Sequence, residues 1–520
     1  MHDFRSRVLR AAALLALAVT LAAPVRATSR TSHSAVTPAH LESVDFSQRL
    51  DANSLGLVLS NLGSFGYDLT SGAAGLEYPL GSGKTALFAG GLWLGAVVNG
   101  SPRVTTAEYA MEFGPGALLP GPASDVHTKP EYKVYKLLRQ YPDGATRDAA
   151  LADYRAGAVP HGAPRVTVLG DGTLGILGDR MLWSVYNDAD VSLHNGSAGS
   201  TAPLGVEVRQ TSYAFSASGA LSNTALLRFQ IRDGGAQALD SMYVALWLDP
   251  DLGGFSDDLV GCDAPAGMGY CYNATNTDAI YGTQPPALGI DLVQGPAVYA
   301  GGPRLGATAF VHYVNGSDPT SAASAYDRMR GLNTGGFPII DPTTSSPTTF
   351  VFSGDPVTQT GWLDTSPADK RMMLSSGPVH LGPGESTDIL VALMVGQGTN
   401  RLSSISALRS VDASVQAQFG GQPALGVGPA TAPGAVLAVA IGPNPVHGEC
   451  SVAFRLPQAA PASLEVFDVH GRRTAGMALG TLAAGPHTNR LELNGAPDGL
   501  YFVRLVQGGR SGWTRMVVAR

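Results

Sequence analysis

The chain has few cysteines, few lysines and no hydrophobic run long enough to cross a membrane. Its three cysteines are too few for a zinc site of four cysteines. Its five lysines and net charge of −7 argue against partners such as nucleic acid or an anionic membrane. The longest apolar run, residues 11–23, is shorter than the roughly 20 residues of a spanning helix. The sequence therefore predicts no transmembrane span in the mature chain.

Familiar catalytic motifs are also missing. The sequence contains no Gly-x-Ser-x-Gly nucleophile elbow and no His-Glu-x-x-His zinc helix. GSGKT at 81–85 resembles the end of a phosphate-binding loop, but Tyr78 stands where the first glycine is required and Pro79 removes a backbone amide. We therefore predict no catalytic residue and no nucleotide-binding residue from motifs, and we expect a β-turn at 81–85.

Residues 1–27 have the three-part layout of a secretory signal. Arg5, Arg7 and Arg10 precede the apolar run, and PVRA follows it with small residues before a cleavage point. We expect the mature chain to begin near Thr28 and to be secreted or held at the cell surface; a retained N-terminal anchor is the alternative. The segment holds four arginines and one aspartate, so its removal changes the net charge from −7 to −10.

Most of the chain reads as β-strand. Residues 92–98 and 103–113 lie on either side of Asn99-Gly100, which is typical of a tight hairpin because both turn residues need positive φ. Residues 165–177 repeat the pattern around Asp171-Gly172. Further strands are expected at 206–217, 225–232, 241–248, 307–314 and 387–395. Many short strands without intervening helices predict antiparallel sheets packed as a sandwich.

Helical patterns are scarce. Residues 129–141 and 320–332 are candidates for short helices, and residues 401–419 form the best amphipathic pattern before Gly420 and Gly421. The uncharged Gly, Pro and Ala residues from 420 to 435 predict a linker. We thus predict an all-β chain: a signal at 1–27, a large β-sandwich region at 28–419 with one helix at its C-terminal end, and a small immunoglobulin-like sandwich at 436–520.

The C-terminal residues carry the most specific resemblance. Pro443-Asn444-Pro445, Val466 to Arg472, Gly485 and Gly499-Leu500-Tyr501 occur in order at the end of the chain. This segment resembles the C-terminal sorting domain of the type IX secretion system, which is similar to the immunoglobulin-like domain of flagellar hook-capping proteins. The resemblance implies a partner, the outer-membrane secretion machinery, bound through residues 436–520. A plain β-sandwich module without that partner is the alternative.

The large region resembles uncharacterised exported proteins that end in the same sorting domain. The matching stretches include SNLGSFGYD, LWSVYNDAD and WLDPDLGGFSDDLVGCD. This resemblance implies an architecture and a destination, but no reaction.

Residues 248–263, LDPDLGGFSDDLVGCD, are the main candidate site. Five aspartates lie there: Asp249, Asp251, Asp257, Asp258 and Asp263. Alternating aspartates followed by glycine can supply the oxygen ligands of Ca²⁺. The match to the helix-loop-helix calcium motif is partial, because Val260 stands where that motif has glutamate and a strand precedes the loop. A solvated loop with local hydrogen bonds and a catalytic carboxylate pair are the alternatives.

A second acidic turn holds Asp188 and Asp190 after the strand ending in LWSVY. If the two preceding strands run in the same direction, both acidic turns lie at one end of the sandwich and all seven aspartates are candidate metal ligands. Cys262 and Cys271 are close enough in sequence either to form a disulfide or to be buried thiols, with Cys450 left over.

Two classes of function remain open on these residues. The first is a secreted or cell-surface, non-enzymatic protein of structural or adhesive type whose acidic loop is stapled by Ca²⁺. The alternative is a glycan-active hydrolase or a carbohydrate-binding protein, with surface glycan as partner. Binding would use exposed faces of Tyr270, Tyr272 and Tyr281 in a long loop at 249–303; packing of these rings within the loop is the alternative.

Overall fold

The computed structural model describes residues 46–119, 123–196, 198, 201–216, 218–298, 303–420, 439–456, 458–468, 472–493, 495–507 and 510–518. The expected signal peptide and residues 421–435 of the expected linker lie outside the described residues. The main region and the C-terminal domain are described separately below.

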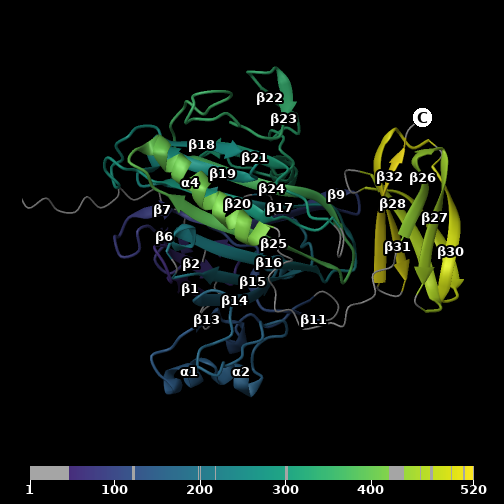
Figure 1. Ribbon diagram of the computed structural model, residues 1–520, viewed down its shortest axis with the longest axis horizontal. Helices are drawn as coiled ribbons and strands as arrows, with labels where there is room; N and C mark the ends of the chain where they lie inside the picture. The colour runs from purple at the N-terminus through teal and green to yellow at the C-terminus, as the bar shows by residue number, and fades with distance from the viewer. Residues whose placement is uncertain are drawn as a thin grey trace, which may run out of the picture. The chain divides into compact units, whose positions relative to one another are not determined.

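Two large antiparallel sheets form the main region (Figure 1). The first sheet has the order β21 (Ala309–Val314), β24 (Lys370–Leu381), β17 (Leu239–Asp249), β8 (Ala89–Val98), β3 (Ser64–Phe65), β2 (Gly56–Ser60), β6 (Leu76–Glu77), β7 (Thr85–Leu87), with β1 (Ser47–Leu50) on β2 and β9 (Ser101–Thr105) on β8.

The second sheet has the order β10 (Gly114–Pro115), β14 (Arg180–Asn187), β15 (Val206–Ala214), β16 (Thr224–Asp233), β25 (Ser386–Gly396), β20 (Ala287–Gln294), β19 (Met268–Asn273), β18 (Asp258–Asp263), with β13 (Tyr135–Leu138) on β14. Short hairpins are β4 (Tyr67–Asp68) with β5 (Ala73–Ala74), β11 (Leu118–Leu119) with β12 (Ala123–Ser124), and β22 (Ile339–Asp341) with β23 (Ser346–Thr348). The predicted sandwich of antiparallel sheets is confirmed.

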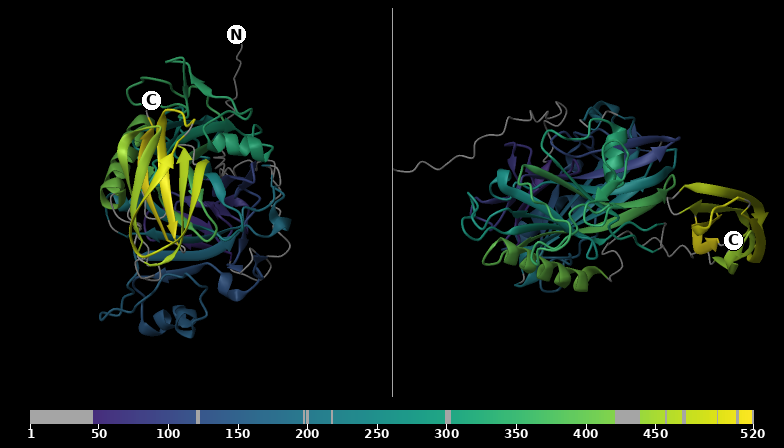
Figure 2. Two further views of the ribbon diagram at one scale, coloured as in Figure 1. Left: turned by 90° about the vertical axis from the view of Figure 1, so that its right-hand side faces the viewer. Right: turned by 90° about the horizontal axis from the view of Figure 1, so that it is seen from above.

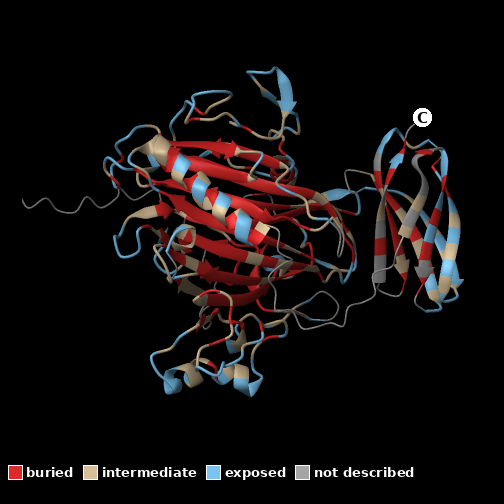
Figure 3. Ribbon diagram, viewed as in Figure 1, coloured by how far each residue is buried: buried red, intermediate tan, exposed pale blue. Residues whose placement is uncertain are grey.

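The main core contains the inward faces of both sheets. Trp93 on β8 and Trp247 on β17 are fully buried and stack with ring centroids 6.4 Å apart, and the Tyr109 ring meets Trp247 edge-on. Strand β20 is buried at every position because it is covered on both faces, by the core and by helix α4 (Arg401–Val415) (Figure 3). Its apolar residues therefore do not alternate with exposed polar ones.

Helix α4 and the Asn-Gly hairpin agree with the sequence predictions. Asn400 caps α4 through the amides of Leu402 and Ser403, and the helix packs across β19, β20 and β25 (Figure 1). One π turn, Gln416–Gly420, extends it. Asn99 and Gly100 have φ of 51° and 81° between β8 and β9.

The other local predictions had mixed outcomes. Helix α3 (Ala322–Met329) is confirmed. The helix expected at 129–141 is wrong: a 3₁₀ turn at Pro130–Tyr132 precedes β13, whose alternating buried residues pair with β14. At 165–177 only one bridge forms, Val168 to Leu174. The sequence also missed α1 (Gly144–Ala150) and α2 (Ala152–Ala156).

The C-terminal domain is a small sandwich of seven strands (Figure 2). Its buried core includes Val452, Val466, Val503, Leu505 and Met516. Strands β26 and β32 pair in parallel at Val446 and Val518, and the other neighbours are antiparallel. The strands are β26 (Val439–His447), β27 (Glu449–Leu456), β28 (Ala460–Asp468), β29 (Arg473–Leu482), β30 (Gly485–Glu492), β31 (Gly499–Gln507) and β32 (Arg510–Val518).

Candidate cation site in the acidic loop

The acidic loop is a short crossing from the first sheet to the second. Strand β17 ends at Asp249 and β18 begins at Asp258, with a 3₁₀ turn at Phe255–Asp257 between them. Asp251 and Gly253 have φ of 44° and 74°, which bends the chain tightly between the sheets. The long loop expected from 249 to 303 is a wrong prediction, because β18, β19 and β20 lie within it.

Asp249, Asp251 and Asp369 converge at the start of this loop. One carboxylate oxygen from each lies within 4.8 Å of the others. Asp249 is fully buried, accepts a hydrogen bond from the Tyr109 hydroxyl, and lies 2.8 Å from Arg371 Nη1 through its Oδ1 atom. The same guanidinium nitrogen contacts Asp369. Three carboxylates and one buried guanidinium therefore form the candidate site.

Sequence reasoning missed Asp369 and Arg371. They belong to the segment Asp369-Lys370-Arg371 at the start of β24, which pairs with β17. The available signal was a run of three charged residues at the start of a strand. That strand is buried at nearly every position. Lys370 is also buried and pairs with Asp364, with 2.9 Å between Nζ and Oδ2.

Asp257, Asp258 and Asp278 form a second group beside the first. Asp258 is fully buried and accepts the Leu252 amide at 3.2 Å; burial, with the nearby charges of Asp251 and Asp257, raises the pKa of Asp258 well above its usual range. Asp278 accepts the Gly254 amide at 2.8 Å through Oδ2. The Asn273 amide nitrogen lies 3.3 Å from Asp257 and 3.4 Å from Asp278, linking the two carboxylates.

Asp263 lies away from both groups. It ends β18, roughly 16 Å along the strand from Asp258 at about 3.3 Å per residue. Its Oδ2 atom is 3.3 Å from Arg409 Nε on α4. The structure therefore brings together Asp249 and Asp251, places Asp257 and Asp258 beside them, and excludes Asp263 from the loop.

Asp188 and Asp190 also lie elsewhere. Asp188 is fully buried and accepts Thr105 Oγ1 at 2.7 Å. Thr105 pairs with Leu94, which pairs with Val244, five residues before Asp249 on β17 and thus roughly 16 Å along the strand. Asp190 caps a 3₁₀ turn through the Ser192 amide and lies 3.3 Å from His127 Nε2. The two acidic turns do not meet.

The three tyrosines expected to form an exposed row are buried. Tyr270 and Tyr272 lie on β19 at 0% and 2% exposure, and Tyr281 is 7% exposed with its hydroxyl donating to the Tyr78 carbonyl at 2.8 Å. The prediction of exposed aromatic faces for sugar is therefore wrong. The pairing of β19 with its two neighbours positions Tyr270 and Tyr272, and the bond to Tyr78 holds Tyr281.

All three cysteines are buried free thiols. In the β18–β19 hairpin Cys262 pairs with Gly269, whereas Cys271 pairs with Val260. The two thiols are therefore offset along the hairpin rather than opposite each other. Of the two alternatives for these residues, the structure has the buried thiols.

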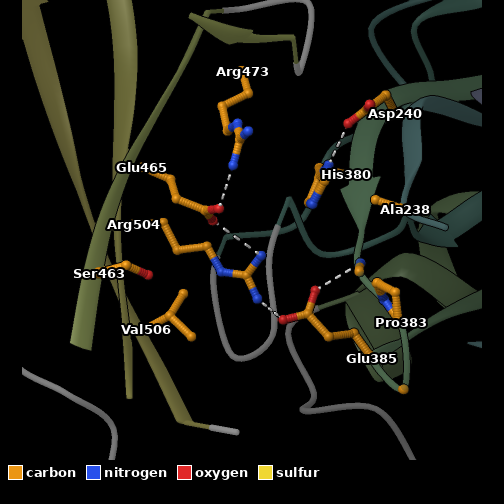
Figure 4. A pocket seen from close by; sticks show the side chains of 12 residues that line it. Ala238, Asp240, His380, Pro383, Glu385, Ser463, Glu465, Arg473, Arg504 and Val506 are labelled. Atoms are coloured by element: carbon orange, nitrogen blue, oxygen red, sulfur yellow. Dashed lines mark hydrogen bonds and ion pairs between the residues drawn. The ribbon is translucent and has the colours of Figure 1, made fainter. Parts of the chain in front are cut away.

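Figure 4 shows, among others, one polar contact within each part of the chain. In the main region His380 Nδ1 lies 2.8 Å from Asp240 Oδ1. In the C-terminal domain Arg473 Nη1 lies 3.1 Å from Glu465 Oε1. Asp240 and Arg473 are substantially exposed, and an exposed ion pair such as Arg473–Glu465 contributes little stability.

Comparison with known proteins identifies the C-terminal domain. Residues 440–519 match the family described as the secretion system C-terminal sorting domain. The C-terminal part of the chain is thus a type IX sorting domain, which implies export and association with the outer membrane or cell surface. Within the described residues no helix is both long enough and apolar enough to cross a membrane.

Similarity to other proteins is slight. No curated protein matches the chain. Among solved structures, a polysaccharide lyase has 10% identity and a TM-score of 0.20, covering 60% of this chain and 34% of its own. PorZ, a bacterial surface component of the type IX secretion system of Porphyromonas gingivalis, has 13% identity and a TM-score of 0.12, covering 68% and 45%. We draw no conclusion from either match, because TM-scores this low do not establish a shared fold.

Proposed function

We propose that the protein is a secreted, surface-associated β-sandwich of non-enzymatic type, with a structural or adhesive role. The observation that carries this proposal is the internal pairing of the acidic loop. Asp249 binds Arg371 and the Tyr109 hydroxyl beneath the surface, whereas a general acid or base must reach a substrate. Carboxylates held in this way stabilise the loop that connects the two sheets.

We further propose that Ca²⁺ completes this fastening. The carboxylates of Asp249, Asp251 and Asp369 carry three negative charges, and Arg371 supplies one positive charge in contact with two of them. Like charges this close repel unless they are protonated or compensated. A divalent cation would neutralise the remainder, and Ca²⁺ accepts carboxylate and carbonyl oxygens in an adaptable shell of roughly six to eight ligands.

The calcium proposal is tested by thermal unfolding of residues 28–520 in EDTA and in millimolar Ca²⁺. A ligand that binds only the native state increases the free energy of unfolding, by about 2.7 kcal/mol at a hundredfold excess over Kd. The unfolding midpoint therefore rises with ligand concentration. We expect this rise in the wild type and its loss in an Asp251→Asn, Asp369→Asn double variant. Asp171→Asn, in an exposed turn, is the matched control. Equal midpoints in EDTA and Ca²⁺ for the wild type would contradict the proposal.

The non-enzymatic role has its own test, independent of calcium. The protein is incubated with a panel of soluble polysaccharides, and new reducing ends or unsaturated products are measured. We expect none above the level of the Asp251→Asn variant. Product formation by the wild type that disappears in Asp251→Asn or Asp257→Asn would assign the loop an acid/base role and overturn the proposal.

A further inference from the structure

A carboxyl pair lies beneath α4, apart from the acidic loop. Asp291 on β20 is fully buried and Asp412 on α4 is 4% exposed. The two carboxyl groups are in hydrogen-bonding contact. Gln416 Nε2, one turn further along the helix, donates to Asp291 Oδ2 at 2.6 Å. The Oδ1 atom of each carboxyl receives no N–H or O–H donor from another described residue.

Strand register and helix spacing produce this contact. Asp263, Met268 and Asp291 pair across β18, β19 and β20, so their side chains point to the same face of the sheet. Helix α4 covers that face. Asp412 and Gln416 are four residues apart and thus share one side of the helix, next to the buried Val415.

The nearby cation is engaged by other carboxylates. Arg409 Nε lies 3.3 Å from Asp263 Oδ2, and its Nη1 atom lies 2.9 Å from Asp355 Oδ1. The other titratable group facing this cluster is Tyr270 on β19, which interacts with Arg409. The charged groups around the pair are therefore two carboxylates and one guanidinium, which leaves no net positive charge to stabilise two further anions.

We propose that Asp291 and Asp412 share one proton, and that this proton fastens α4 to the second sheet. The proton resides on one carboxyl group and is donated to an oxygen of the other, so the pair carries a single negative charge that Gln416 also solvates. When a base removes it, two carboxylates face each other in a buried space, and repulsion is relieved by separating α4 from β20. Burial, with the neighbouring carboxyl, raises the pKa of Asp291 well above its usual range.

The consequence concerns the C-terminal end of the described main region, because α4 and its π turn are the last elements described there before residue 421. The π turn after α4 is held by Gln294 Nε2, which donates to the Phe419 carbonyl at 2.6 Å. Loss of the proton loosens the C-terminal half of α4 first, since Asp412 and Gln416 lie there. The packing of the C-terminal half of α4 against the second sheet thus depends on pH.

The test compares the full mature chain with Asp412→Asn, Asp291→Asn and the exposed control Asp171→Asn. A carboxyl whose pKa is higher in the folded than in the unfolded state makes its full contribution to stability below the unfolded pKa, about 4. This contribution is lost as the pH rises from about 4 toward the folded pKa. We expect the wild-type unfolding midpoint to fall by several degrees more than that of either amide variant between about pH 5 and about pH 9. An amide keeps the hydrogen bond without a titrating proton.

Hydrogen exchange gives a readout that needs no variant. After correction for intrinsic rates, we expect amides of residues 408–416 in the wild type to lose protection by roughly tenfold or more on going to about pH 9, while β25 stays protected. Parallel pH curves for the wild type and both amide variants would overturn the proposal. So would abolition of the wild-type pH dependence by millimolar Ca²⁺ or Mg²⁺, which would show that the pair holds a cation.

Discussion

Asp249 and Arg371 face each other on adjacent strands, with 2.8 Å between Oδ1 and Nη1. Leu248 on β17 pairs with Met372 on β24, so the next residues along each strand are neighbours across the ladder. The first aspartate of the acidic loop therefore receives its counter-charge from a strand distant in sequence. This relationship, rather than the loop sequence, determines what the loop carboxylates can bind.

Removing Arg371 should be costly. Arg371→Met leaves the buried Asp249 and the partly buried Asp369 without this cation, and breaking one partner of a buried pair such as Asp249–Arg371 costs about 3–5 kcal/mol. We expect this loss in urea unfolding, with partial recovery in the Arg371→Met, Asp249→Asn double variant. Millimolar Ca²⁺ should stabilise Arg371→Met more than the wild type. A loss below about 1 kcal/mol would show that the pair contributes little.

Asp188 should contribute strongly to stability, because its carboxylate is hydrogen-bonded within the fold. Its carboxylate accepts the amides of Leu204, Gly205 and Val206 at 2.7 to 2.9 Å, besides Thr105 Oγ1. Asp188→Asn would turn an NH₂ group toward some of these donors, and we expect a loss of about 3 kcal/mol or more in urea unfolding. Asp190→Asn is the control, because asparagine caps a helical turn as well as aspartate. Equal effects of both variants would contradict this role.

Asp233 should give a second, separable pH dependence. It is fully buried, and burial raises its pKa to about 7, with Asp188 adding to the effect. The folded state holds a proton that the unfolded state releases above about pH 4, so stability falls as pH rises from about 4 to 7 and is constant beyond. Asp233→Asn should remove this fall, on the order of a few kcal/mol, as measured by urea unfolding at about pH 5 and about pH 8. An unchanged slope would show that Asp233 does not titrate in this range.

The sequence predicted correctly those elements that are determined by residues close together in the chain. The Asn99-Gly100 turn requires positive φ, and α4 carries an apolar stripe of 3.6-residue period that ends before Gly420, so the turn and the helix were both predicted. The helix expected at 129–141 failed because pairing with β14 overrode its local pattern. Contacts among distant strands assembled the candidate site, so Asp369 and Arg371 could not be assigned to it from the sequence.

The burial of the loop tyrosines has the same cause. Tyr270 and Tyr272 follow a turn-rich acidic segment that reads as a continuing loop, yet they pair with both neighbouring strands. Apolar and polar residues alternate along a strand only where one of its faces is exposed to solvent. Here α4 covers the outer face, so the polar alternation that would have indicated a strand is weak.

Close approach of backbones between strands should make Gly91 irreplaceable. A Cβ atom at this position would lie 1.8 Å from the Ala107 carbonyl oxygen, which is backbone and cannot rotate away. We expect Gly91→Ala to cost about 3 kcal/mol or more, or to prevent folding, in urea unfolding and soluble expression. Gly170→Ala is the control, since nothing lies within 4 Å of a Cβ there. Similar stability of the two variants would show that the sheet yields at Gly91.

The sorting domain should direct export without stabilising the main region. Its seven strands enclose a core of their own. In a cell that has the type IX system, we expect deletion of 436–520 to leave the protein in the periplasm, whereas the full chain reaches the surface or medium. The purified shortened chain should melt within a few degrees of the main transition of the full chain. Equal export of both chains would assign the export signal to residues before 436, and a large drop in melting temperature would show that the two parts stabilise each other.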